Sequence, residues 1–223
     1  MQRTLIKTED GSHSLYVNDL DEQYHSKHGA IQEGKHVFIE AGLKHVASHN
    51  NSPIRILEIG LGTGLNSFLT LIESEKLNLP IHYTALEAFP LELDLITELN
   101  YVECLNEERI KNKFIQIHSS DWEKEISLSE LFCIHKIKGT LQEVQFDETY
   151  HLIYFDAFGP AVQPEMWTEE IFNKLYSALK PNGCLFTYCA KGEVKRTLKK
   201  VGFTVAALPG PPGKREMVRA IKT

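Results

Sequence analysis

The sequence predicts an α/β fold: a mostly parallel sheet with one late antiparallel strand, covered by helices on both faces and preceded by a small N-terminal hairpin extension. Three observations predict it. Short apolar runs alternate with stretches of helical periodicity, which is typical of parallel βαβ units. A glycine-rich turn joins the first of these runs to a helix. The last two runs are joined by a connection too short for a crossover helix.

The first fifty residues differ from the rest of the chain. Residues 1–20 alternate weakly between apolar and polar side chains and contain the pair Asp10-Gly11, which favours a hairpin turn. Residues 21–50 have the pattern of a loop followed by a helix. We therefore expect a hairpin-and-helix extension over residues 1–50 and one α/β domain over residues 51–223.

Regular alternation begins after the extension. The pattern predicts, in chain order, strand Ile54–Ile59, helix Asn66–Glu75, strand Ile81–Glu87, helix Pro90–Leu99, strand Phe114–His118, strand His151–Asp156, helix Thr168–Leu179, strand Cys184–Cys189 and helix Gly192–Val201. Two short strands near Phe203–Ala206 and Glu216–Ile221 close the chain. Because their connection is short and rich in Pro and Gly, they should pair antiparallel. That pattern is typical of Rossmann-like methyltransferases rather than of all-parallel dinucleotide folds.

Composition argues against a membrane or metal protein. No apolar run approaches the ~18 residues that span a bilayer, and the N-terminus lacks a signal-peptide pattern, so we expect a cytoplasmic protein. The four cysteines form no C-x-x-C pair. His45 and His49 are spaced for one helix face, but no third ligand follows at metal-like spacing. We therefore expect no bound metal ion.

Charge is distributed unevenly along the chain. Residues 184–223 hold nine Lys and Arg but two acidic residues, a net charge of about +7, whereas the first 183 residues hold 15 basic and 28 acidic residues. Such asymmetry can mark an anion-binding face on an acidic body. The same pattern also fits a lysine-rich helix that is simply solvated, and composition alone leaves both interpretations open.

The glycine turn after the first strand predicts the cofactor. Its residues follow the pattern E-x-G-x-G-x-G, and the expected cofactor-binding residues there are Glu58, Gly60, Gly62, Gly64 and Asn66. Glycines allow a sharp turn and a close approach of the backbone to a ligand. The dinucleotide fingerprint needs a sixth-position glycine, where this chain has Leu65. The spacing is instead similar to motif I of S-adenosylmethionine (SAM) methyltransferases.

Two more acids are candidate cofactor ligands because each follows an expected strand. Glu87 ends the second strand, where a carboxylate can accept hydrogen bonds from both ribose hydroxyls. Asp121 follows the expected third strand and could approach the adenine amino group. A helix N-cap is an equally good interpretation of Asp121.

The end of the fourth strand carries the most specific motifs. Asp156 ends that strand, where ligands bind in parallel sheets. The chain resembles the tRNA 5-methylaminomethyl-2-thiouridine methyltransferase family, which includes standalone MnmD and the methyltransferase half of MnmC. The resemblance runs from about residue 12 to the end and rests on residues 60–66 (GLGTGLN), 86–90 (LEAFP), 155–160 (FDAFGP), 164–167 (PEMW) and 213–217 (GKREM). The chain departs from the family at Ala157, where glycine is common, and in its Pro211-Pro212 loop.

The resemblance implies that residues 51–223 form a SAM-dependent methyltransferase domain. Its reaction would place a methyl group on the exocyclic amine of 5-aminomethyl-2-thiouridine at the wobble position of tRNA. Asp156 would then be catalytic, holding the amine and accepting its proton. The substrate-binding residues would be Phe158, Trp167, Lys214 and Arg215. Phe158 and Trp167 could equally be core packing under a loop. Residues Tyr24, His25 and Lys27 could form a lid, but no role is assigned to them.

Two other functions fit parts of the sequence. An aminopropyltransferase resembling spermidine synthase has a related fold and an aspartate after the fourth strand, but that family usually has a G-G-G-D-G turn. A non-catalytic SAM- or RNA-binding module is the other alternative, and the acids Glu58, Glu87 and Asp156 argue against it. No partner protein can be identified from the sequence.

Overall fold

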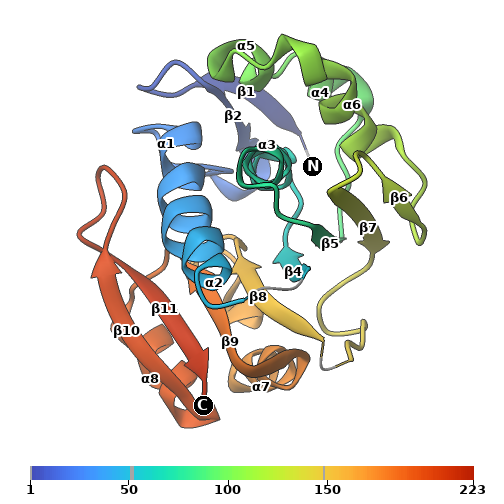
Figure 1. Ribbon diagram of the computed structural model, residues 1–223. Coiled ribbons are helices and arrows are strands. Elements are labelled where there is room, and N and C mark those ends of the chain that lie inside the picture. Colours follow the sequence, from blue (N-terminus) through green and yellow to red (C-terminus); the bar gives the residue numbers. More distant parts are fainter. Residues whose placement is uncertain (1, 51–52, 148) are drawn as a thin grey trace.

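A computed structural model describes residues 2–50, 53–147 and 149–223 of the chain. Its centre is an eight-stranded sheet with helices on both faces (Figure 1). The strands are β4 (Ile54–Ile59), β5 (Ile81–Glu87), β6 (Glu125–Ser127), β7 (Phe132–Lys138), β8 (Tyr150–Phe155), β9 (Leu179–Thr187), β10 (Phe203–Pro209) and β11 (Glu216–Lys222). Their spatial order is β10-β11-β9-β8-β4-β5-β7-β6.

Strand directions confirm the predicted architecture. The five central strands, β9, β8, β4, β5 and β7, run parallel to one another, and the short edge strand β6 is antiparallel to β7. Strand β11 lies between β9 and β10 and is antiparallel to both. The sheet is therefore mostly parallel with a late antiparallel strand, as the short connection between the last two strands predicted.

Two helical layers cover the sheet. In Figure 1, α3 and the continuous helix α1–η2–α2 lie on one face, and α7 and α8 lie on the other. The helices are α1 (Ala30–Gly34), the π-helical η2 (Lys35–Leu43), α2 (Lys44–Ala47), α3 (Leu65–Leu77), α4 (Leu93–Thr97), α5 (Tyr101–Leu105), α6 (Lys111–Ser119), α7 (Glu169–Ala178) and α8 (Gly192–Val201). Short 3-10 turns are η1 (Asn18–Leu20), η3 (Glu108–Ile110) and η4 (Pro164–Trp167).

Local sequence explains the helices that flank the site. In α8 only Val194 and Leu198, four residues apart, are buried, and its remaining positions are polar or at the helix end. Helix α7 begins where the Thr168 hydroxyl accepts a hydrogen bond from the Ile171 amide at 3.3 Å, an N-cap. The predicted helix and strand boundaries in this half of the chain are confirmed to within a few residues, except that β9 begins earlier, at Leu179.

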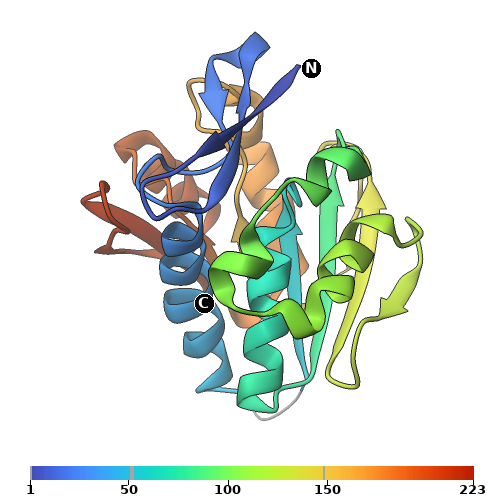
Figure 2. The same ribbon diagram turned by 90° about the horizontal axis from the view of Figure 1, so that it is seen from above.

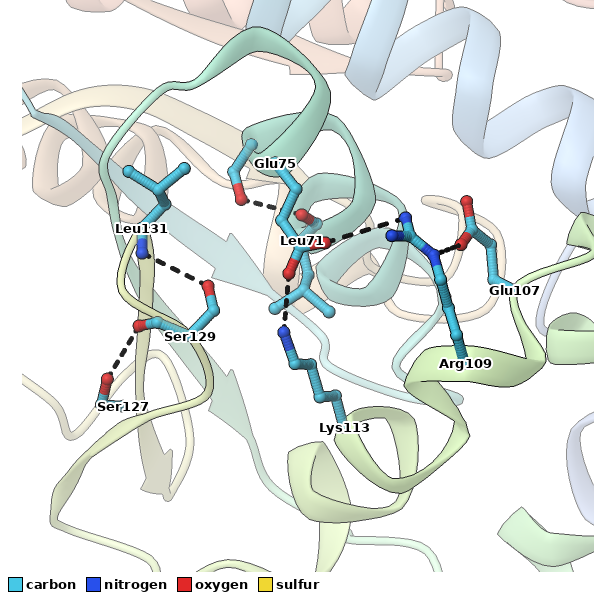
Figure 3. A network of polar contacts seen from close by, with 9 residues as sticks. Leu71, Glu75, Glu107, Arg109, Lys113, Ser127, Ser129 and Leu131 are labelled. Carbon is cyan, nitrogen blue, oxygen red and sulfur yellow. Dashed lines mark hydrogen bonds and ion pairs between the residues drawn. The ribbon is translucent and has the colours of Figure 1, made fainter.

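The predicted third strand is wrong. Residues 114–118 lie in helix α6, because Phe114 and Ile117, three residues apart, are its buried pair and so follow helical rather than strand periodicity. The third parallel strand is β7, in which buried and half-buried residues alternate. Figure 3 shows how α6 is tied to α3: Glu75 accepts a hydrogen bond from Lys113 at 2.6 Å and lies 3.9 Å from Arg109.

The N-terminal extension forms a second, smaller sheet. Strands β1 (Arg3–Lys7), β2 (His13–Val17) and β3 (Glu22–Gln23) pair antiparallel, and the hairpin turn falls at the predicted Asp10-Gly11. Figure 2 shows this sheet, in dark blue, above the main sheet. The expected boundary at residue 51 lies outside the described residues. No helix in the described part of the chain is long and apolar enough to cross a membrane.

Candidate active site

A pocket of about 890 Å³ opens at the carboxyl ends of the parallel strands. This volume is within the range of small-molecule sites, and the location is where open α/β sheets bind ligands. Its walls come from the turn after β4, the ends of β5 and β8, the loop 139–143 after β7, the extension around residues 22–28 and the loop before β11. Segments distant in sequence therefore meet at one site.

The glycine turn forms the floor of this pocket. Gly60 and Gly62 line it and have positive φ angles of +89° and +49°. A Cβ atom at Gly60 would lie 3.1 Å from the Asp156 carbonyl oxygen, so the tight turn needs glycine there. Gly64, at φ +71°, lies outside the pocket: a Cβ there would come within 2.4 Å of the His118 imidazole. Its role is to let α3 begin close to α6.

Behind the turn lies a group of buried polar atoms. Glu58 is fully buried, and its carboxylate lies next to the Tyr83 hydroxyl and the Asn66 side chain. Burial, and then the nearby Asp156 carboxylate, raise the pKa of Glu58 well above its ordinary value. Asn66 donates a hydrogen bond to Asp156 at 2.8 Å, so this side chain lies between the Glu58 and Asp156 carboxyl groups. Glu58 does not line the pocket, but Asn66 does.

Glu87 is held in place by two backbone amides. One carboxylate oxygen accepts a hydrogen bond from the Gly62 amide at 2.9 Å, and the other accepts one from the Phe89 amide at 2.8 Å. Each carboxylate oxygen has two lone pairs, so both can accept a further hydrogen bond from a ligand. Glu87 lines the pocket and also joins the end of β5 to the glycine turn.

Asp156 lines the same pocket at the end of β8. Burial raises the pKa of Asp156 to about 7, and the Glu33 carboxylate adds to the rise. The hydrogen bond from Asn66 and the Lys214 ammonium oppose it. A carboxyl group with a pKa near neutrality can exchange a proton at neutral pH, which an ordinary aspartate cannot do effectively. The structure therefore contains a candidate acid–base group at the predicted position.

Glu33 and Tyr188 are pocket residues that the sequence did not predict. Lys214 Nζ lies 2.5 Å from the Glu33 carboxylate and 3.8 Å from the centre of the Tyr188 ring. The Tyr188 hydroxyl donates a hydrogen bond to the Ala157 carbonyl at 2.8 Å. The signal for Glu33 was present in the sequence, since an acid three residues after Ala30 falls on the apolar face of the helix.

Of the two aromatic residues predicted to bind substrate, one lies in the pocket and the other is buried behind it. Phe158 lines the pocket, where its ring packs edge-on against Tyr24 at 5.3 Å. Trp167 is buried behind it: its indole nitrogen donates a hydrogen bond to the Phe158 carbonyl at 2.8 Å, and its ring packs against Phe155 at 4.9 Å. Trp167 therefore supports the loop that carries Phe158.

Besides Glu58, Gly64 and Trp167, two more predicted site residues lie outside the pocket, Asp121 and Arg215. Asp121 is exposed and forms an ion pair with Lys124 at 2.7 Å. Because the expected strand before it is helix α6, Asp121 does not follow a strand end. The true third strand leads instead into the loop 139–143, which lines the pocket. Arg215 is exposed next to Lys214, which does line the pocket.

The extension closes one side of the site. Tyr24, His25 and Lys27 all line the pocket. His25 is held by Ser14, whose hydroxyl lies 2.9 Å from its Nδ1, and burial lowers the pKa of His25 to about 4. At neutral pH this imidazole is therefore uncharged and contributes hydrogen bonding rather than a positive charge.

Comparison with known sequences identifies related proteins. The profile of a family described as S-adenosyl-L-methionine-dependent methyltransferase matches residues 100–223. The tRNA 5-methylaminomethyl-2-thiouridine biosynthesis bifunctional protein MnmC of Pseudomonas entomophila is 26% identical over 218 residues, which cover 93% of this chain and 33% of that protein. The chain spans about a third of the length of the curated relatives of this name that it matches.

Comparison with solved structures shows the same fold. The crystal structure of MNMC2 from Aquifex aeolicus matches with a TM-score of 0.80 and 24% identity, covering all of this chain and 71% of that one. Spermidine synthase from Thermotoga maritima matches with a TM-score of 0.54 and 15% identity, covering all of this chain and 72% of that one. At these identities both likenesses concern the fold alone.

Proposed function

The chain belongs to the S-adenosyl-L-methionine-dependent methyltransferase family, and from this premise we propose that it methylates the exocyclic amine of 5-aminomethyl-2-thiouridine at the wobble position of tRNA. The family match confirms the predicted enzyme class and SAM as cofactor. The predicted resemblance to the MnmC and MnmD family is confirmed as well. The amine and tRNA assignments rest on the relatives' names and on the chemistry of the pocket.

The residues of the glycine turn and of β5 fit the cofactor. Gly60 and Gly62 bring backbone to the pocket floor where a side chain would intrude, and Glu87 has spare lone pairs for ribose hydroxyls. Asn66 lines the pocket and contacts the buried Glu58, so Glu58 would act on the cofactor through Asn66 rather than by direct contact. When bound, SAM supplies an electrophilic methyl group on a sulfonium sulfur.

The observation that carries the proposal is Asp156, whose pKa is about 7 at the end of β8. An amine that attacks a methyl group must be neutral when it attacks, because an ammonium has no lone pair. The Asp156 carboxylate accepts the proton that the amine gives up, and Asn66 keeps this carboxylate oriented by its 2.8 Å hydrogen bond. A carboxyl group with a pKa near the working pH is a more effective base than an ordinary aspartate.

The remaining pocket residues bind the nucleoside in this proposal. Phe158 forms an apolar wall beside the amine. Trp167 positions Phe158 by donating a hydrogen bond to the Phe158 backbone carbonyl. Lys214 and Arg215 lie where a nucleotide phosphate could be recognised, one at the pocket and one on the adjoining surface. A tRNA substrate implies a cytoplasmic enzyme.

The basic helix α8 extends the tRNA surface away from the pocket. Lys191, just before α8, lines the pocket, and Arg196 and Lys199 lie further along the helix. Among the residues that the structure describes, none of these three forms an ion pair. Lys195 and Lys200 differ, because they pair with Glu216 and Glu169 at 2.9 and 2.5 Å. The unpaired cations are those available to phosphates.

One experiment separates this function from its alternatives. The protein is incubated with methyl-labelled SAM and tRNA that carries the unmethylated aminomethyl wobble uridine, and in parallel with decarboxylated SAM and putrescine. Label in the wobble nucleoside after digestion supports the proposal. Aminopropyl transfer to putrescine would support the spermidine-synthase-like alternative, and SAM binding without product in either reaction would support a non-catalytic module.

A further inference from the structure

Three potential metal ligands meet at the edge of the main sheet, far from the pocket. His82 is the second residue of β5, Cys133 the second residue of β7 and Glu125 the first residue of β6. We call these three residues the edge cluster. His82 and Cys133 are direct partners in the parallel β5–β7 register. His82 and the pocket residue Glu87 are five residues apart on β5, a distance of about 16 Å.

The ligand atoms of the edge cluster converge. Cys133 Sγ lies 3.0 Å from His82 Nδ1, and the same nitrogen lies 3.5 Å from a Glu125 carboxylate oxygen. All three atoms lie within 4.8 Å of one another. In a tetrahedral zinc site with bonds of about 2.0–2.3 Å, two ligand atoms are separated by about 3.3–3.6 Å. The two distances from His82 Nδ1 are close to this spacing, and the third pair of ligand atoms lies within 4.8 Å.

Without a metal ion, polar contacts hold the three side chains together, because Cys133 contacts both His82 Nδ1 and the Glu125 carboxylate. A neutral imidazole Nδ1 has either one proton or one lone pair, so it can serve the thiol or the carboxylate but not both at full strength. A cation is attracted to the imidazole nitrogen, the thiolate and the carboxylate at once. A cation can bind all three ligand atoms at once, in place of the thiol proton, which Cys133 releases when it binds a metal.

The cluster is also accessible to an ion. The His82 and Glu125 side chains are 41% and 60% exposed, and Cys133 is partly buried between the strands. Solvent can enter and can supply a fourth ligand. A sulfur and an imidazole nitrogen favour Zn²⁺ or a similar transition metal over Mg²⁺ or Ca²⁺, which prefer oxygen ligands.

We propose that His82, Cys133 and Glu125 bind one zinc ion at the outer edge of the main sheet, with water as the fourth ligand. The ion joins β5, β7 and the three-residue strand β6, so its effect is to stabilise the edge of the sheet. No sequence motif reveals the site, because its ligands come from three strands that only the sheet topology brings together.

Cobalt substitution tests this site directly. The metal-free protein is titrated with Co²⁺, which gives a thiolate-to-cobalt charge-transfer band when a cysteine is a ligand, and the bound ion is then displaced by Zn²⁺. We expect one equivalent to bind with this band. Replacing His82 with Ala should weaken Co²⁺ binding at least about tenfold, and Cys133→Ser should abolish the band.

The exposed Cys104 provides the matched control, because Cys104→Ser removes a thiol outside the cluster and should leave the band unchanged. Circular dichroism verifies that each variant is folded. Zn²⁺ should also raise the melting temperature of the unmodified protein but not that of Cys133→Ser. Absence of the band, or its persistence in Cys133→Ser, would overturn the proposal.

Discussion

Lys214 Nζ lies 2.5 Å from the Glu33 carboxylate, and this ion pair joins the loop before β11 to helix α1 across the pocket. Both partners act on Asp156, in opposite directions. The Glu33 carboxylate raises the pKa of Asp156, because a second negative charge nearby disfavours ionisation, whereas the Lys214 ammonium lowers it. Burial chiefly raises the pKa of Asp156, and the pair adjusts this pKa as well as fixing the position of the loop.

Removing the negative charge of Glu33 and removing the positive charge of Lys214 should shift the pH–rate profile in opposite directions. In Glu33→Gln the acidic limb of kcat/KM should move to lower pH, since the like charge is gone. In Lys214→Met it should move to higher pH, each by up to about one pH unit. Methyl transfer to the tRNA substrate is measured over a pH series. Shifts of the same sign in both variants would show that a general structural change, and not charge, controls Asp156.

Replacing Asp156 by Asn should separate catalysis from cofactor binding. The side chain keeps its shape and can still accept the Asn66 hydrogen bond, but it can no longer accept a proton. Turnover should fall by about 100- to 10,000-fold, the usual contribution of a general base. SAM affinity, measured by calorimetry, should change little. Higher pH should restore part of the rate by deprotonating the free amine, and wild-type turnover in this variant would exclude the role.

The difference in folding stability between the Asp156→Asn variant and the unmodified protein should grow in favour of the variant as pH rises. The pKa of Asp156 is raised from 3.8 to about 7 in the folded state. Between these values the unfolded chain has already released the proton while the folded chain retains it, so the stability of the unmodified protein falls as pH rises through this window. The amide side chain of the Asp156→Asn variant does not titrate. The advantage in melting temperature of Asp156→Asn should therefore be smallest near pH 4 and largest above about pH 7.

The fold could be predicted because periodicity and turn chemistry are local properties. The glycine turn, the amphipathic helix α8 and the final hairpin were all visible in the sequence. The third strand was not, because residues 114–118 contain apolar residues at both helical and strand spacing. Strand β7 was hidden by its polar positions, among them Lys136, which is buried against the Trp122 ring.

The site was predictable where a residue ends a strand or belongs to a motif. Asp156 and Glu87 both line the pocket for that reason. Glu33 and Tyr188 belong to no motif, and only the packing of the extension against the sheet brings them to Lys214. Asp121 was assigned from the wrong strand, so its error follows directly from the error in the fold.

Loss of Glu87 should weaken SAM binding while leaving the fold intact. Glu87→Ala removes the proposed ribose acceptor and the hydrogen bond to the Gly62 amide. We expect a loss of about 1.5–3 kcal/mol in binding free energy, typical of hydrogen bonds to a charged group. Calorimetric titration with SAM measures it. Glu92→Ala, an exposed acid in the same connection, is the control and should bind normally. Equal affinity in Glu87→Ala would remove Glu87 from the cofactor site.

The lysine and arginine side chains on α8 and just before it should contribute to tRNA affinity. Those that form no ion pair within the described residues should contribute more than those paired with an acidic side chain. In the described ranges 2–50, 53–147 and 149–223, Lys191, Arg196 and Lys199 form no ion pair. Replacing all three with Gln should weaken tRNA binding. It should also reduce the slope of log affinity against log salt by about 0.7–0.9 for each phosphate that the variant no longer binds. Filter binding at several salt concentrations measures both quantities.

The paired lysines of the same helix make the control for that experiment. Lys195 and Lys200 already neutralise Glu216 and Glu169, so their replacement removes less charge that phosphates can use. The double variant Lys195→Gln and Lys200→Gln should therefore change the salt slope less per residue than the triple variant does. If the two variants lose affinity equally per charge removed, the surface acts only through net charge. If neither loses affinity, the lysines of α8 serve solubility and tRNA binds elsewhere on the protein.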